Sequence, residues 1–147
     1  MGKSFPKILH CLVCEDARLE QGGLLTLTGV YGIVQDFTIL ISSFEGYIPR
    51  LTFVFTAGPA ESSFSIRLDV KDMSDKSIFA SPLQELKIPM TSQKDRYNQI
   101  IVGVGNIKFP APGKYEVQLS ADGSLLYRDT FEVRLNELRA STILTSQ

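Results

Sequence analysis

The stretch FSIRLDVK at residues 64–71 alternates strictly between apolar and polar side chains. Because successive side chains of a β-strand point to opposite faces, this alternation predicts a strand that has one face on a core and the other in water. The same alternation occurs in YEVQLS at residues 115–120 and in FEVRL at residues 131–135. Strands buried on one face only are typical of antiparallel sheets, so the three stretches predict an antiparallel all-β fold.

The composition of the whole chain is also that of a β-protein. The β-branched residues are abundant, with 12 Ile, 9 Val and 9 Thr against 7 Ala, and such side chains favour the pleated surface of a sheet. A chain of 147 residues buries roughly 68–70% of its unfolded surface, which suffices for a core without metals or disulfides. We therefore predict a single domain over residues 1–147, with residues 1–5 and 140–147 as flexible tails.

Turn residues divide the remaining chain into further short strands. Clusters such as QGG at residues 21–23 and PAPG at residues 110–113 mark the turns. Eight or nine short strands at this spacing fit two packed antiparallel sheets, so we predict a β-sandwich. Besides the three alternating stretches, the candidate strands are Lys7–Ala17, Leu24–Val34, Asp36–Ile41, Arg50–Ala57, Ser77–Ile88 and Asn98–Phe109.

Two local features are predicted within these strands. In the second candidate strand the apolar residues Leu25 and Leu27 are at odd-numbered positions, whereas Val30 is at an even-numbered one. This change of face, beside Gly29 and Gly32, indicates a bulge or bend in the strand. Near the C-terminus, the two alternating stretches are joined through ADG at residues 121–123. We expect a three-residue loop there, with Gly123 in the left-handed conformation, because it would pair apolar residues on one face.

The segment from residue 109 to residue 133 resembles the closing hairpin of immunoglobulin-like and fibronectin-like domains. It contains FPAPGKY at residues 109–115, DG at residues 122–123 and FEV at residues 131–133. In those folds a tyrosine near the start of the penultimate strand often forms a tyrosine corner, and Tyr115 has that place. The resemblance implies an immunoglobulin-like β-sandwich in which Tyr115 and Gly123 are structural residues.

The N-terminal part carries a second resemblance. LHCLVCEDAR at residues 9–18, followed by GGLLTLTGVYG at residues 22–32, is similar to the opening of an uncharacterised bacterial protein family of about 150 residues. The resemblance implies an all-β bacterial protein without an assigned function. It transfers no catalytic or binding residue.

The charges and apolar runs bear on location and partners. The 15 Lys and Arg nearly cancel the 16 Asp and Glu, so the sequence shows no basic footprint for nucleic acid or anionic lipid. No apolar run approaches the roughly 20 residues of a membrane span, and the N-terminus lacks the apolar region of a signal peptide. We therefore expect a cytoplasmic protein whose partner is neither nucleic acid nor a membrane.

Two cysteines and the single histidine are the first candidates for chemistry. A zinc site needs four converging ligands, whereas Cys11 and Cys14 would point to opposite faces of a strand, and only Cys14 shares a face with His10. We expect two core cysteines, with a metal shared across a dimer and redox sensing as alternatives. His10 lies in an apolar strand, where a packed imidazole is more common than a catalytic base. No catalytic residue and no cofactor are predicted.

The carboxylates are the second candidates. Glu15 and Asp16 are adjacent and diverge on a strand, so with Arg18 nearby we interpret them as a polar strand end with an ion pair. Asp69, Asp72 and Asp75 resemble in spacing the acidic loops that hold calcium. Lysines dilute their charge and no glycine opens the loop, so we expect a solvated hairpin turn.

Two functions fit these observations. The first is a non-catalytic protein-interaction or structural module, a homo-oligomer or accessory subunit, because residues 8–14 are apolar on both faces and need cover on both sides. The alternative is a small-ligand domain, for carbohydrate or metal, or an enzyme with its pocket at the loop tips near residues 44–47 and 91–97. The spacing of Tyr31, Tyr47, Tyr97 and Tyr127 gives no sign of a common binding platform.

Overall fold

The computed structural model describes residues 5–21, 24–33, 38–41, 43–58, 63–87 and 98–135. Of the predicted tails, residues 1–4 and 140–147 lie outside these ranges. The described residues form ten strands and no α-helix, where the sequence predicts eight or nine strands. The strands are β1 (Ile8–Leu19), β2 (Leu25–Ile33), β3 (Thr38–Ile41), β4 (Ile48–Ala57), β5 (Ser63–Asp72), β6 (Ser77–Ala80), β7 (Gln84–Lys87), β8 (Asn98–Ile107), β9 (Gly113–Ala121) and β10 (Ser124–Leu135).

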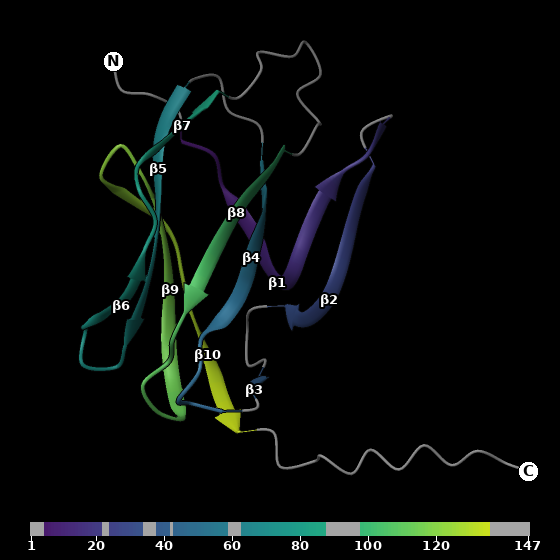
Figure 1. Cartoon of the computed structure of the whole chain (residues 1–147). Helices are drawn as coiled ribbons and strands as arrows, with labels where there is room; N and C mark the ends of the chain where they lie inside the picture. The colour runs from purple at the N-terminus through teal and green to yellow at the C-terminus, as the bar shows by residue number, and fades with distance from the viewer. Residues whose placement is uncertain are drawn as a thin grey trace, which may run out of the picture.

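The strands form two sheets that face each other across one core (Figure 1). The first sheet has the order β2-β1-β4-β8, and the second has the order β3-β10-β9-β5-β6, with β7 also paired to β5. The pairs are antiparallel except that of β10 with β3, which is parallel. The predicted all-β fold of two sheets is therefore confirmed, and one parallel pair is added. The outer part of the β1–β2 hairpin extends beyond the second sheet (Figure 1).

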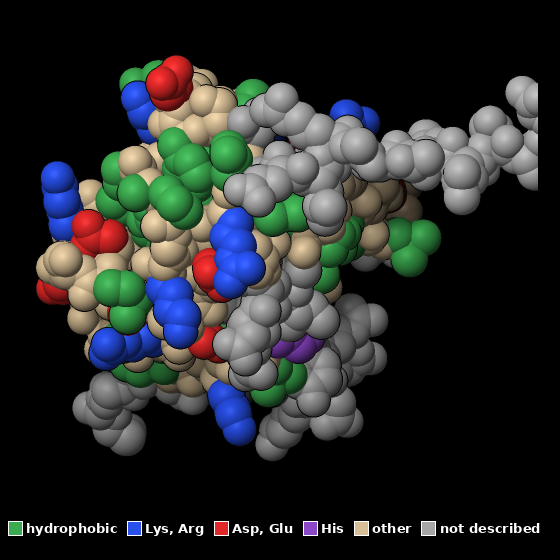
Figure 2. Space-filling model, turned by 90° about the horizontal axis from the view of Figure 1, so that it is seen from below, with side chains coloured by type: hydrophobic (Ala, Val, Ile, Leu, Met, Phe, Trp, Pro, Cys, Tyr) green, Lys and Arg blue, Asp and Glu red, His purple; other side chains and the backbone are tan. Residues whose placement is uncertain are grey.

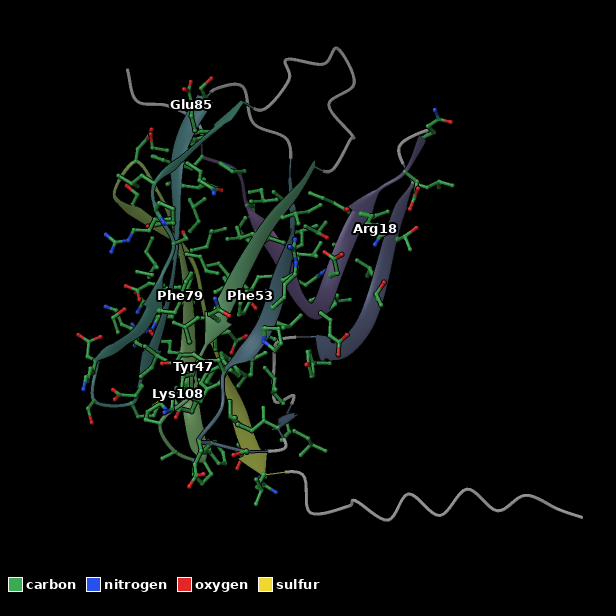
Figure 3. The ribbon with its side chains drawn as sticks, viewed as in Figure 1. Arg18, Tyr47, Phe53, Phe79, Glu85 and Lys108 are labelled. Atoms are coloured by element: carbon green, nitrogen blue, oxygen red, sulfur yellow. The ribbon has the colours of Figure 1, made fainter. Side chains whose placement is uncertain are left out.

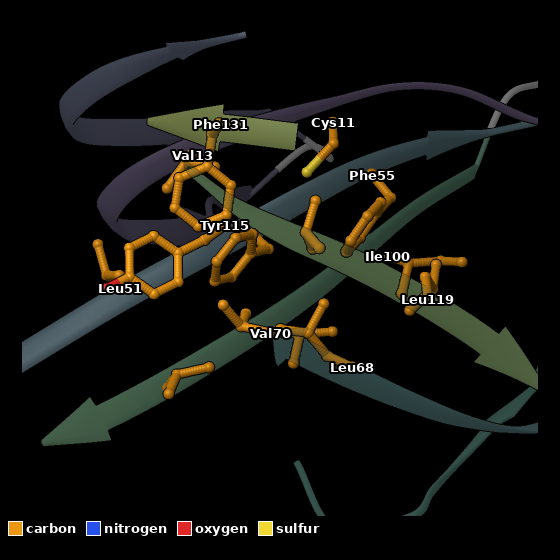
Figure 4. Packing of buried hydrophobic residues seen from close by; sticks show 14 of the residues in the cluster. Cys11, Val13, Leu51, Phe55, Leu68, Val70, Ile100, Tyr115, Leu119 and Phe131 are labelled. Carbon is orange, nitrogen blue, oxygen red and sulfur yellow. The ribbon is translucent and has the colours of Figure 1, made fainter. Parts of the chain in front are cut away.

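The core consists of the apolar faces that the alternation predicts. In β5 the apolar positions from Phe64 to Val70 are buried, while Arg67 is exposed. Figure 4 shows side chains of both sheets in this layer, including Phe55 of β4 and Leu119 of β9. Each such side chain contributes about 1.5–3 kcal/mol when it leaves water. The largest fully buried side chains are Val13, Ile39, Leu51, Phe53, Phe55, Phe64, Leu68, Ile100, Ile107, Phe109, Leu119 and Phe131.

The hairpin between β9 and β10 differs from the prediction. The loop has two residues, because Ala121 pairs with Ser124, and both Asp122 (φ +49°) and Gly123 (φ +82°) are left-handed. This is the geometry of a tight type I′ turn, which matches the twist of the strands. A register shift between Leu125 and Tyr127 then restores the parity of the apolar face. The expectation of a three-residue loop is therefore wrong. A two-residue loop followed by a bulge in β10 also places the apolar side chains of the two strands on the same face.

Tyr115 lies at the start of β9 and faces the core. Its hydroxyl donates a hydrogen bond to the Ala111 carbonyl oxygen at 2.5 Å, which is the contact that characterises a tyrosine corner. Its ring contacts Phe109, with ring centroids 4.9 Å apart. Burial raises the pKa of the Tyr115 hydroxyl. Tyr115 thus fixes the loop before β9 to the core.

Charged side chains on the surface form local pairs. Arg128 contacts Glu116 at 2.8 Å, and Lys71 contacts Asp75 at 3.3 Å. On the end of the molecule shown in Figure 2, Lys and Arg side chains are interspersed with Asp and Glu. Exposed pairs of this kind contribute only about 0–1 kcal/mol each. They keep the surface mixed in sign and add little to stability.

The stretch predicted as one strand, Ser77–Ile88, contains two strands in the structure. Both β6 and β7 pair with β5, and Ser81, Pro82 and Leu83 separate them. Pro82 has no N–H with which to continue the ladder. At the break, the Ser81 N–H donates to the Leu68 carbonyl oxygen, and Ser81 Oγ accepts from the Leu68 N–H, both at 2.8 Å. The buried Ser81 therefore replaces the missing ladder bonds.

Replacing Ser81 with alanine would leave the Leu68 N–H buried without its acceptor. We expect Ser81→Ala to lower the free energy of unfolding by about 1–3 kcal/mol, measured by urea denaturation. The matched control is Ser77→Ala, because the Ser77 hydroxyl donates to Asp69 at 2.8 Å in an exposed position; its loss should stay within about 0.5 kcal/mol. Equal losses in the two variants would contradict the role given to Ser81.

Candidate functional site

Two adjoining hollows lie between the edge strands of the two sheets. The larger has a volume of about 320 Å³ and the smaller about 180 Å³, and they share Tyr31, Ile48 and Pro49 as walls. We call them together the Tyr31 groove. Its other described lining residues are Leu40, Ile41, Ser43, Gly46 and Tyr47 in the larger hollow and Glu15 and Arg50 in the smaller. The groove therefore combines β1, β2, β3 and the start of β4.

Tyr31 enters the groove because of an irregularity in β2. In the pairing of β1 with β2, Val13 lies opposite Gly32 but Cys14 lies opposite Val30, so Tyr31 is an extra residue. This confirms the bulge predicted from the change of parity. The ring is half-buried against the core. Burial, and after it the negative charge of Glu15, raises the pKa of the Tyr31 hydroxyl.

Glu15 lies within β1, directly after Cys14. The Thr52 hydroxyl donates to the Glu15 carbonyl oxygen at 3.1 Å and fixes its backbone. Its carboxyl group lies against Gly29 of β2, which has a φ of +64°. A Cβ atom on Gly29 would come within 2.7 Å of Glu15 Cδ, closer than side-chain carbons approach. Gly29 thus permits both the backbone turn in β2 and the position of the carboxyl group.

Asp16 is engaged elsewhere. Its carboxylate pairs with Arg50 at 3.1 Å and with Arg18 at 3.7 Å. The Arg50 guanidinium also lies over Gly103, whose missing side chain leaves room for it. The two adjacent carboxylates therefore differ: Asp16 has cations beside it, whereas Glu15 pairs with no Lys or Arg in the described part of the chain. The interpretation of both residues as one ion-paired strand end accounts for Asp16 only.

Tyr47 forms the other end of the groove. Its side chain is 64% exposed, and the Lys108 Nζ atom lies 5.6 Å from the centre of its ring. Figure 3 shows Tyr47 beside Lys108, and Arg18 apart from both on the β1–β2 hairpin. Within the preceding loop, the Glu45 N–H donates to Ser43 Oγ at 3.0 Å. The ring of Tyr47 therefore already attracts one ammonium group of the protein.

The cysteines and the histidine lie in different environments. Cys11 belongs to the core, and Cys14 is equally buried but lies opposite Thr52, with its Sγ 3.3 Å from the Asp16 carbonyl oxygen. His10 is exposed. Both thiols are free, and burial raises the pKa of each. The three side chains do not converge on one point.

Asp69 and Asp72 at the end of β5, and Asp75 just after it, serve the turn between β5 and β6. Asp72 Oδ1 accepts hydrogen bonds from the Ser74 and Lys76 N–H groups, both at 2.9 Å. Asp69 accepts one from Ser77, and Asp75 pairs with Lys71. Among all residues that the structure describes, no group of three or more His, Cys, Asp or Glu side chains is placed to hold a metal ion.

Part of the groove could be predicted from the sequence. The loop-tip segment at residues 44–47 does contribute Gly46 and Tyr47 to it, while residues 91–97 lie outside the described ranges. Tyr31 and Tyr47 share the larger hollow although their spacing gives no sign of it. Tyr127 lies elsewhere, with its ring centre 5.7 Å from that of Phe55. The parity change before Val30 was the signal that could have pointed to Tyr31.

A third hollow, of about 460 Å³, lies beside the end of β10 and is lined by Pro112, Gly113, Glu132, Arg134 and Leu135. Its two charged side chains, Arg134 and Glu132, pair with each other at 2.7 Å. The Tyr31 groove instead brings together two tyrosines and a carboxylate that pairs with no Lys or Arg among the described residues. It is the better candidate for a binding site because its polar groups have free capacity.

The fold and the groove define a small all-β protein with a recess between the edges of its two sheets. Residues 9–134 match the group described as "Family of unknown function (DUF6941)", and the chain belongs to this family. This confirms the resemblance to an uncharacterised all-β family that the N-terminal residues indicate. No curated protein matches the chain.

Among solved structures, the chain is similar to the Pseudomonas fluorescens alkylpurine DNA glycosylase AlkC bound to DNA containing an abasic site analog. The sequence identity is 14% and the TM-score is 0.46. The similarity covers 90% of this chain and 31% of that chain. The chain thus spans less than a third of the length of that enzyme.

The expectation about partners needs correction. From the sequence we expect a protein partner or a second copy and exclude nucleic acid, but the similar solved structure is bound to DNA, so this expectation is wrong. Net charge averages over the surface and does not exclude a local site. The strand β1 is central in its sheet, between β2 and β4, and its Cys11, Val13 and Cys14 are buried within the chain itself. In the described residues, no helix is long and apolar enough to cross a membrane.

The buried thiols and tyrosines predict a loss of stability at alkaline pH. Burial is the largest cause that raises the pKa of Cys11, Cys14, Tyr31, Tyr115 and Tyr127. The unfolded chain loses these protons from about pH 9 upward while the folded chain retains them, so stability falls as pH rises.

We expect the free energy of unfolding in urea to fall by at least about 1.4 kcal/mol between pH 8 and pH 10.5, the equivalent of one pKa unit at one site. Cys11→Ala should show a smaller decline, because one of the buried thiols is gone. A urea midpoint that stays constant over this range would contradict the prediction.

Gly29→Ala tests the local geometry of the groove. Alanine is strained at the positive φ of Gly29, and its Cβ would displace the Glu15 carboxyl group, so we expect a loss of about 1–2 kcal/mol in urea denaturation. The control is Gly105→Ala, whose Cβ would meet only the Pro49 carbonyl oxygen at 3.6 Å. A Gly29→Ala protein as stable as the Gly105→Ala protein would refute this account.

Proposed function

We propose that the protein is a non-catalytic binding module, a single immunoglobulin-like β-sandwich whose Tyr31 groove takes a small organic ligand. The observation that carries this proposal is the convergence of Tyr31, Tyr47 and Glu15 on one groove. These residues come from β1, β2 and the loop before β4. These residues come together only in the folded chain, as is usual for a binding site whose residues are held by a scaffold of strands.

The size and lining of the groove support a small ligand. Its larger hollow of about 320 Å³ lies at the lower end of the range of small-molecule sites, which is about 300–1,000 Å³. The walls are mostly apolar or aromatic, and a few polar groups such as Glu15 and Tyr31 lie among them. This combination is typical of sites in which apolar walls give affinity and polar groups fix orientation.

The immunoglobulin-like class rests on the closing hairpin. The Tyr115 hydroxyl bonds to Ala111, and the tight turn at Asp122 and Gly123 joins β9 to β10 in the second sheet. The family resemblance and the two free thiols support a bacterial, cytoplasmic protein, because thiols persist in a reducing compartment.

A set of small probes tests the proposal. We would record ¹H–¹⁵N spectra of the full chain with glucose, choline, acetate and a short DNA duplex. At least one small probe should shift the amide signals of Tyr31, Ile48 and their neighbours, and it should be recovered unchanged. Tyr47→Ala should weaken this binding several-fold, because it removes an exposed ring that lines the groove.

Leu125→Ala is the control for that variant, since Leu125 is also exposed but does not line the groove. Binding that is equally weakened in both variants would argue against the groove. Shifts caused by the DNA duplex and by none of the small probes would replace the proposal with nucleic-acid binding. Conversion of a probe would show an enzyme.

A further inference from the structure

We infer that the ligand of the Tyr31 groove is an alkylated organic ammonium compound, an inference that rests on the function proposed above. It names the chemical class of the ligand from the charge and the aromatic rings of the groove. Three properties of the lining residues lead to it: the state of the Glu15 carboxylate, the environment of the two tyrosines and the character of the walls.

The first property is charge. Among the described residues, two charged side chains line the smaller hollow, Glu15 and Arg50. The Arg50 guanidinium pairs with Asp16 at 3.1 Å, a carboxylate that Arg18 shares at 3.7 Å, and it does not pair with Glu15. The Glu15 carboxylate pairs with no cation of the described chain, although Gly29 and Thr52 hold the residue in place. A ligand group that is electrostatically complementary to the Glu15 carboxylate is therefore a cation.

The second property is the presence of two aromatic rings. An ammonium group is attracted to the face of a tyrosine ring, and sites for quaternary ammonium ligands are commonly built from such rings. Tyr47 already shows this attraction toward the Lys108 ammonium group at 5.6 Å. Lys108 itself does not line the groove. The Tyr31 hydroxyl is neutral at neutral pH, as tyrosine hydroxyls ordinarily are, so it adds no second negative charge.

The third property is the apolar wall. Leu40, Ile48 and Pro49 line the larger hollow beside the tyrosines. Alkyl groups on a nitrogen atom fit such a wall, whereas each hydroxyl group of a sugar would need a hydrogen-bonding partner there. An inorganic divalent cation would need several oxygen ligands, and the described residues hold no group of three acidic or metal-binding side chains. An alkylated ammonium group satisfies all three properties.

A matched pair of probes separates charge from shape. Choline and 3,3-dimethylbutan-1-ol have the same shape, but a carbon atom replaces the positively charged nitrogen in the alcohol. We would titrate each probe into the full chain and follow the amide signals of Tyr31 and Ile48. Choline should bind at least about tenfold more tightly than the alcohol, as expected for a charged group beside an opposite charge.

Two isosteric variants locate the charge. Glu15→Gln should weaken choline binding by about tenfold and leave the alcohol unchanged. Glu45→Gln is the matched control, because it removes the same charge from an exposed residue that is absent from the groove lining. Equal weakening by the two variants would attribute the effect to overall charge and overturn the inference. If Glu15→Gln alters the spectrum of the free protein, the two probes on the unaltered chain decide.

The outcomes distinguish the inference from the proposed function. Equal binding of choline and the alcohol, or shifts in the groove caused only by glucose or acetate, would overturn the ammonium ligand and leave the small-ligand site in place. Binding of no small probe in the groove would overturn both. Choline binding that depends on Glu15 and shifts the groove signals would support both.

Discussion

The pairing of β1 with β2 on one side and with β4 on the other holds the first sheet together and positions the walls of the Tyr31 groove. This strand carries Cys11 and Val13 into the core and, further along, the two carboxylates at residues 15 and 16. Tyr31 is the extra residue of a bulge in β2, between the partners of Val13 and Cys14, and its ring packs against the core. A regular β2 would shift the residues that follow Val30 to the opposite face, and the groove would lose its central wall.

The fold was largely predictable because its signal is local. Alternation in residues 64–71 and 115–120 specifies which face of β5 and β9 is buried, and no distant residue is needed to read it. The prediction of the turn between β9 and β10 was wrong because two different local arrangements place the same side chains on the apolar face. A three-residue loop, and a two-residue loop followed by a bulge before Tyr127, both return apolar residues to one face. The break at Ser81 was missed because the polar residue serves the neighbouring strand β5.

The site was less predictable because it depends on contacts between distant elements. The residues that stand out in the sequence have structural roles: Cys11 lies in the core, Cys14 in the first sheet, and the aspartates near the end of β5 in a hairpin turn. The groove needs the parallel pairing of β3 with β10, which brings Leu40 toward the edge of the first sheet. No local pattern announces a parallel pair of four residues. Only the loop at residues 44–47 was recognisable in advance, because loop tips commonly carry binding residues.

The bulge at Tyr31 also bears on the behaviour of the molecule at high concentration. The outer side of β2 is the edge of the first sheet, where unpaired backbone groups invite a strand of another chain. An extra residue interrupts the regular spacing of those groups and increases the local twist. At the other wall, β3 offers only four residues. The same irregularities that shape the groove therefore make both edges poor templates for aggregation into extended sheets.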